Sequence, residues 1–150
     1  MIELHPVRGH NSYCGPAVIS ALTGVSTDEA AFLLRLYTGR KLITTTKPVE
    51  VVPVLRALNL HVERFQVFDL EFDGPTLRDW LTCFSVPWTG VSLVATVDHW
   101  QVVAGDLLAD NEHRTPINWR FIRKRYLRER VETVWAVCPR DLSRQSDQTA

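Results

Sequence analysis

The spacing of apolar residues divides this chain into a front part with a helical period and a back part with a strand period. Apolar side chains recur at helical spacing over residues 14–22, 27–37 and 48–58. The first helix is expected to end near Gly24. Ser26 and Glu29 have the capping-box spacing that opens the second helix, which is expected to end about Gly39. The front half is therefore predicted to be mostly helical.

The third helical segment and the residues after it have a less regular pattern. Residues 44–48 open this helix, Pro53 interrupts its middle, and Asn59 marks its expected end. Residues 61–67 then alternate between apolar and polar, as a half-buried strand does. Residues 75–81 suggest one more short helix.

From Gly90 onward, β-branched and aromatic runs alternate with turn signals. The runs cover residues 91–97, 100–104, 107–109 and 131–137. Turn signals lie between these runs: Asp98-His99 and Gly105-Asp106 separate the first three, and Asp110-Asn111 follows the third. This pattern is expected of consecutive antiparallel strands. Helices followed by a sheet predict an α+β fold, with N-terminal helices packed on a C-terminal antiparallel sheet.

Length and composition are those of one domain. A chain of 150 residues with 45% hydrophobic content can form one core of its own. We expect this domain to span residues 1–140, because residues 141–150 have almost nothing to bury and are predicted to be a disordered tail.

Charge and cysteine content restrict the partners and the compartment. The 17 basic and 17 acidic side chains balance, so no global field favours nucleic acid or a membrane surface. Three cysteines are an odd number, which suits a reducing compartment better than a disulfide framework. No apolar run approaches the roughly 20 residues of a membrane span. We therefore expect a cytoplasmic protein that does not act at a membrane.

Metal and cofactor binding are not indicated. The histidines and cysteines are scattered, and neither Cys-x-x-Cys nor His-x-x-x-His spacing occurs. Cys83 and Cys138 lie in apolar surroundings without basic neighbours, so we interpret them as core or incidental thiols. The prediction is therefore no metal and no cofactor.

Cys14 has a different context. Gly15, Pro16 and Ala17 follow it and begin the first helical segment, since proline is tolerated in the first turn of a helix. The free backbone N–H groups and the positive dipole end at a helix start favour thiolate over thiol. Cys14 is therefore the candidate nucleophile.

His99 and Asp110 complete the candidate chemistry. His99 begins a predicted strand and can act as the base for the thiol. The turn at Gly105-Asp106 returns the chain, so Asp110 can lie near His99 and orient its ring. The backbone N–H of Cys14 and the amide of Asn11 are candidate oxyanion donors.

At these residues the chain resembles the papain-like cysteine peptidases, and more closely the compact branch that includes bacteriocin-leader-processing peptidases. The resemblance is carried by Cys-Gly-Pro-Ala over residues 14–17 and by His-Trp-Gln-Val-Val over residues 99–103. It implies a papain-like fold, a Cys14 nucleophile, a His99 base and an Asp110 acid, which hydrolyse an amide bond through an acyl-enzyme. The family's oxyanion donor is usually a glutamine at the position that Arg8 occupies here.

Several alternatives stay open at this point. His10 could line the cleft, and Asn111 could replace Asp110 as the group that orients the histidine. The expected partner is a protein or peptide substrate, but deamidation and acyl transfer need the same nucleophile and base. A catalytically silent binding module of the same fold is the alternative from a different class.

A basic segment over residues 119–130 is the remaining candidate for function. It carries aromatic residues between its arginines and lysine and could contact phosphates or an acidic partner. We interpret it instead as an amphipathic segment whose Phe121, Ile122, Tyr126 and Leu127 pack inward under the basic stems. Nucleic-acid binding is therefore not expected.

Overall fold

The computed structural model describes residues 3–68, 74–84, 90–97 and 99–140. The front part forms α1 (Cys14–Thr23), α2 (Thr27–Thr38), α3 (Pro48–Ala57) and β1 (Leu60–Val67). Next come α4 (Leu77–Asp79), the π-helical turn η2 (Trp80–Phe84), β2 (Val91–Thr96), β3 (His99–Ala104) and β4 (Leu107–Ala109). The chain continues with β5 (Ile117–Asn118), the 3₁₀ turn η3 (Trp119–Phe121), α5 (Lys124–Leu127) and β6 (Val131–Pro139). The predicted tail over residues 141–150 lies outside the described residues.

The predicted helix ends agree with the backbone. Gly24 and Gly39 end α1 and α2 in the left-handed conformation, with φ of 83° and 72°, which glycine adopts without a Cβ clash. The Ser26 side chain accepts a hydrogen bond from the Glu29 backbone N–H and caps α2. α3 runs through Pro53, so this proline removes one backbone hydrogen bond without ending the helix.

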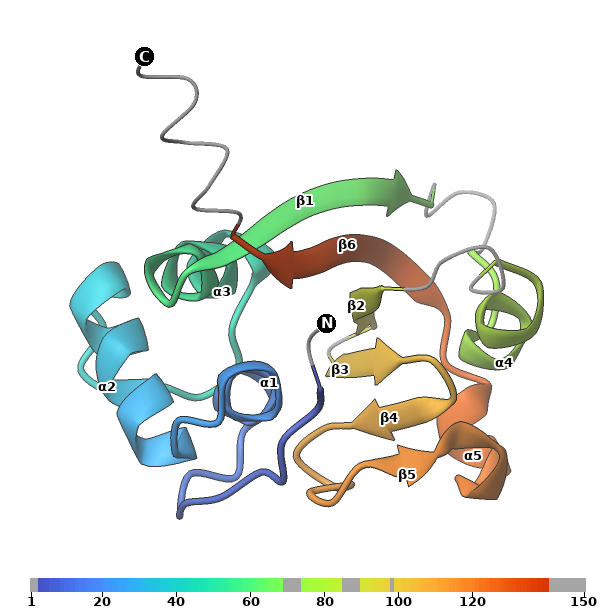
Figure 1. The fold of residues 1–150 in the computed structure, drawn as a ribbon, viewed down its shortest axis with the longest axis horizontal. Helices are drawn as coiled ribbons and strands as arrows, with labels where there is room; N and C mark the ends of the chain where they lie inside the picture. Colours follow the sequence, from blue (N-terminus) through green and yellow to red (C-terminus); the bar gives the residue numbers. More distant parts are fainter. Residues whose placement is uncertain (1–2, 69–73, 85–89, 98, 141–150) are drawn as a thin grey trace.

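The strands form one antiparallel sheet of six, in the order β1-β6-β2-β3-β4-β5. The predicted consecutive pairing holds from β2 to β4. The last strand departs from it, because β6 returns across the molecule and lies between β1 and β2 (Figure 1). The α+β class is thus confirmed. The two-residue strand β5 and the turns beside it have no sequence pattern long enough to predict them.

Helices cover the sheet from both sides. Two clusters of buried apolar side chains divide the strands, with Leu93 of β2 in one cluster and the adjacent Val94 in the other. The first cluster includes residues of α1, α2 and α3, and the second includes residues of α4, η3 and α5. Figure 1 shows these two groups of helices on opposite sides of the strands. Because successive strand residues face opposite sides, both faces need apolar residues.

The first helix is central to the larger cluster. Every residue of α1 from Cys14 to Leu22 is buried, and the helix packs against α2, α3 and β3. The Trp100 indole N–H on β3 donates to the Thr46 carbonyl at 2.9 Å, and this bond ties the loop before α3 to the sheet. The start of α1 is therefore held between this loop and the strand that carries His99.

The basic segment differs in one position from its predicted packing. Ile122 and Leu127 are buried and Tyr126 is half-buried, but Phe121 is 78% exposed, so its inward assignment was wrong. Trp119 and Ile122, three residues apart in the tight turn of η3, occupy the inward face instead. Phe121 lies between them and points to solvent.

The two cysteines outside the candidate site were interpreted as core or incidental thiols; both are exposed, which excludes the core alternative. Cys83 lies in the π-helical turn η2, and Cys138 lies near the end of β6 opposite His61.

Among the described residues, no single helix is long and apolar enough to cross a membrane; α1 and α2 pass that test only together, as a pair bent by 112°.

Candidate active site

Cys14 is the first residue of α1, at the end of the helix where backbone N–H groups lack intrahelical acceptors. Tyr13 precedes it as the N-cap, and no side chain caps the helix there. Pro16 has no N–H, so the groups of Cys14 and Gly15 form the open N-terminus. This end of the helix dipole favours a negative charge on sulfur.

His99 lies beside Cys14 although 85 positions separate them in the sequence. Its ring is in hydrogen-bond contact with the Cys14 side chain. The Nε2 atom of the same ring lies 2.9 Å from Oδ2 of Asp110. Since the carboxylate takes Nε2, the contact with sulfur falls to Nδ1. The three side chains therefore form a continuous chain from thiol to carboxylate.

The β3–β4 hairpin brings Asp110 to His99. Gly105 turns the chain with a φ of 59°, and Val102 then pairs with Ala109. Continuing this register places Asp110 opposite Gln101, whose neighbour on the same strand face is His99. The spacing of the two residues in sequence is thus fixed by the length of the hairpin.

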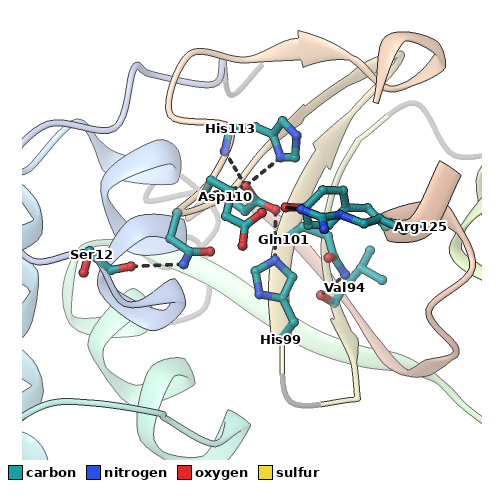
Figure 2. A network of polar contacts seen from close by, with 10 residues as sticks. Ser12, Val94, His99, Gln101, Asp110, His113 and Arg125 are labelled. Atoms are coloured by element: carbon teal, nitrogen blue, oxygen red, sulfur yellow. Dashed lines mark hydrogen bonds and ion pairs between the residues drawn. The ribbon is translucent and has the colours of Figure 1, made fainter. Parts of the chain in front are cut away.

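Asp110 is held by more than His99. Its Oδ1 accepts hydrogen bonds from the backbone N–H of Glu112 at 2.9 Å and of His113 at 2.6 Å. The same oxygen lies 2.9 Å from Nδ1 of His113, so the carboxylate lies between two imidazole rings (Figure 2). Asp110 is only 2% exposed. Such a carboxylate is fixed in orientation and cannot rotate away from His99.

The electrostatics of the pair follow from these contacts. Burial alone would lower the pKa of His99, but the hydrogen bonds to Asp110 and Cys14 and their negative charges raise it to about 9. Burial alone would raise the pKa of Asp110, but the bonds from His99 and His113 hold it below its usual value. With a pKa of about 9, the His99 ring is therefore protonated at neutral pH, beside an ionised Asp110.

A cleft of about 640 Å³ opens onto the sulfur and the imidazole. Its wall is formed by the loop before α3, the start of α3, and the ends of β2, β3 and β6. Trp100, which the sequence placed beside the base, lies in this wall. Cys14 is 7% exposed, so a reagent reaches its sulfur through the cleft.

Three buried hydroxyl groups in this cleft have no hydrogen-bond partner. They belong to Thr46, Thr96 and Thr133, and all three residues line the same cleft as Cys14. A buried hydroxyl without a partner costs free energy. The sequence analysis missed these threonines, because nothing in the pattern around them differs from ordinary loop and strand residues.

Thr46 also explains the glycine after the nucleophile. A Cβ at position 15 would lie 2.1 Å from the Thr46 hydroxyl oxygen and 3.2 Å from its Cβ. Gly15 therefore lets the loop before α3 lie directly on the start of α1. This contact holds Thr46 next to the residue that follows Cys14.

Asn11 does not reach the cleft. Its side-chain oxygen accepts from the Tyr13 backbone N–H at 3.0 Å, and Asn11 is not among the residues that line the cleft. The Arg8 guanidinium bonds the Gly24 carbonyl instead. His10 is exposed and also lies outside the lining.

Asn111 contacts the loop that precedes Cys14 rather than His99. Its amide donates to the Ser12 carbonyl at 3.0 Å, which joins the loop after β4 to the residues before α1. Asn111 makes no hydrogen bond to His99; Asp110, its neighbour in the sequence, makes that bond instead.

In the described residues, no group of three or more His, Cys, Asp and Glu side chains could hold a metal ion.

Comparison with known proteins identifies the fold and little else. No protein-family model matches the sequence, and neither does a curated protein. Among solved structures, the peptidase domain of Streptococcus ComA, a bifunctional ABC transporter involved in a quorum-sensing pathway, superimposes with a TM-score of 0.54. The fold is similar to that of a peptidase domain. The match covers 93% of this chain and 100% of that one at 15% sequence identity, so it concerns the fold alone.

The packing of Gly15 against Thr46 can be measured by a double-mutant cycle. Gly15→Ala is expected to lower the free energy of unfolding by about 1–3 kcal/mol, because the new methyl group overlaps the threonine hydroxyl. Adding Thr46→Ala removes that hydroxyl and should recover part of the loss in urea unfolding. Strictly additive effects would contradict the contact.

The raised pKa of His99 can be followed by NMR of its ring protons. The ring should titrate near pH 9 in the native protein, and Asp110→Asn should move the midpoint down toward 6.5. Because the folded pKa lies above the unfolded value, the stabilisation is complete below about pH 6.5 and is lost as pH rises through 9. A midpoint near 6.5 in the native protein would refute the arrangement.

Proposed function

We propose that this protein is a papain-like cysteine hydrolase, a peptidase or isopeptidase that cleaves an amide bond through a thioester acyl-enzyme. One observation carries the proposal: Cys14 interacts with His99, His99 with Asp110, and Cys14 and His99 both line a cleft of about 640 Å³. The similarity of the fold to a peptidase domain supports the choice of amide substrates. Protein or peptide segments are therefore the proposed substrates.

The mechanism assigns one role to each side chain. The Cys14 thiolate attacks the carbonyl carbon of the substrate, and the C–N bond breaks as His99 donates its Nδ1 proton to the leaving amine. Water then attacks the thioester carbonyl while His99 accepts its proton. The C–S bond breaks, which releases the carboxylic acid and restores the Cys14 thiolate and the protonated His99. Asp110 keeps the imidazole oriented and stabilises its positive charge throughout.

The negative oxygen of the intermediate needs two hydrogen-bond donors. The backbone N–H of Cys14 supplies one, as the sequence predicts. Asn11 would have to break its bond to Tyr13 and turn into the cleft to supply the other. The hydroxyl of Thr46 already lies in the cleft, buried and without a partner, and we assign the second donation to it.

Two related chemistries use the same groups. Deamidation and acyl transfer also pass through a thioester and differ only in the group that enters or leaves. The site needs no cofactor for any of the three. The three free cysteines of the described residues suit a reducing compartment, and we propose the cytoplasm.

A catalytically silent binding module of the same fold is the second candidate function. The observation that favours it is Asn11, which is bonded to Tyr13 outside the cleft and leaves no amide side chain at the expected oxyanion position. In that case Cys14→Ala would preserve biological activity. Under the peptidase proposal the same substitution abolishes it.

Thiol labelling tests the activated nucleophile directly. Iodoacetamide at pH 7 should alkylate Cys14 before Cys83 and Cys138, although Cys14 is buried and the other two are exposed. The two exposed thiols serve as internal controls in the same sample, read by peptide mass spectrometry. His99→Ala should slow labelling of Cys14 alone. Equal rates at all three cysteines would remove the nucleophile from the proposal.

The kinetics of two variants test which side chain is the second oxyanion donor. Once a cleaved peptide is in hand, Thr46→Val should lower kcat by roughly 100-fold with little change in KM, because the lost donor acts mainly in the transition state. Asn11→Ala should change kcat far less. A larger loss for Asn11→Ala than for Thr46→Val would return the role to Asn11.

A further inference from the structure

A second pocket continues the cleft along the sheet. It has a volume of about 440 Å³ and shares Lys47 and Pro48 with the cleft that contains Cys14. We call it the basic pocket. Its remaining lining residues are Val49, Val52, Pro53, Arg56, Arg64 and Trp135. The two hollows therefore meet at the start of α3.

The floor of the basic pocket is apolar and open to solvent. Val49 is 75% exposed, and Pro53 and Trp135 are half-buried. Covering exposed apolar surface of this kind with a ligand lowers the free energy of the system, because the surface is removed from water. An aliphatic side chain fits this floor.

The rim of the basic pocket is cationic. Lys47, Arg56 and Arg64 are exposed, and no carboxylate lines the pocket with them. In the described part of the chain none of the three forms an ion pair, whereas Arg40 in the neighbouring cleft is paired with Glu50 at 3.0 Å. The rim therefore complements a carboxylate on the ligand.

Donors without partners connect the two hollows. Thr133 lies in the cleft and Trp135 in the basic pocket, two residues apart on β6 and so on the same face of that strand. The hydroxyl of Thr133 and the indole N–H of Trp135 are both buried without an acceptor. They are separated by roughly 7 Å along the strand, which two residues of an extended peptide also span.

We propose that the basic pocket is a specificity site for the substrate of Cys14, and that it selects an extended peptide segment carrying an aliphatic residue next to an acidic one. The aliphatic side chain covers Val49 and the part of Trp135 left open by the Arg64 guanidinium, which lies 5.9 Å from the ring centroid, and the carboxylate lies among the cations. The peptide backbone runs along β6 past Thr133 and Trp135. The assignment of the occupant rests on the proposed function, because the pocket opens into the cleft of the nucleophile.

Binding can be measured without turnover in the full chain with Cys14→Ala. The probe is the peptide acetyl-Ala-Leu-Glu-Ala-amide, titrated while the NMR signal of the Trp135 indole N–H is recorded. We expect a saturable shift of that signal. The matched peptides with Leu-Gln or Ala-Glu in place of Leu-Glu should bind at least fivefold more weakly.

Substitutions in the basic pocket test where the carboxylate of the bound peptide lies. Arg64→Gln should weaken binding of the Leu-Glu peptide severalfold, while Arg78→Gln, an exposed arginine on α4 across the sheet, should leave it unchanged. Lys47→Gln gives a second, independent reading if Arg64→Gln unfolds. No saturable shift, equal binding of the three peptides, or binding unaffected by both pocket substitutions would overturn the site.

This test is separate from catalysis. Binding by the Cys14→Ala protein together with an inert wild-type enzyme would refute the hydrolase and keep the site. Hydrolysis by the wild type without selection for Leu-Glu would refute the site and keep the hydrolase.

Discussion

The position of one carboxylate governs the whole candidate site. Asp110 is almost fully buried, and its two oxygens receive bonds from His99, His113 and two backbone N–H groups. A carboxylate so bonded stays ionised, because each donor stabilises the charged form. Its charge in turn stabilises the imidazolium of His99, which faces the nucleophile. Without this fixed anion, burial would favour a neutral histidine.

The fold supplies the two surfaces that this interaction joins. The helical side presents the open N-terminus of α1, and the sheet side presents the β3–β4 hairpin. Two bonds hold the surfaces together near the site, one from Trp100 to the Thr46 carbonyl and one from Asn111 to the Ser12 carbonyl. Both connect a strand or hairpin loop to a loop that borders α1. The reacting atoms thus lie at a seam that is fixed on either side.

The cleft combines this rigid seam with unsatisfied polar groups. Core residues of α1 and β3 are packed without exposure, yet three threonine hydroxyls beside them lack partners. Buried polar groups are normally paired, and three of those without a partner in the described residues share this cleft. Further along β6, the indole N–H of Trp135 is also buried without an acceptor.

The sequence by itself determined the local structure and the short-range chemistry. Helix ends at Gly24 and Gly39, the cap at Ser26 and the hairpin that returns Asp110 toward His99 all depend on neighbouring residues, so they could be predicted. The place of β6 between β1 and β2, the outward Phe121 and the exposed Cys83 and Cys138 depend on long-range packing. So do the contact of Cys14 with His99 and the position of Thr46, rather than Asn11, in the lining of the cleft, because only the tertiary structure decides which distant side chains share a cleft.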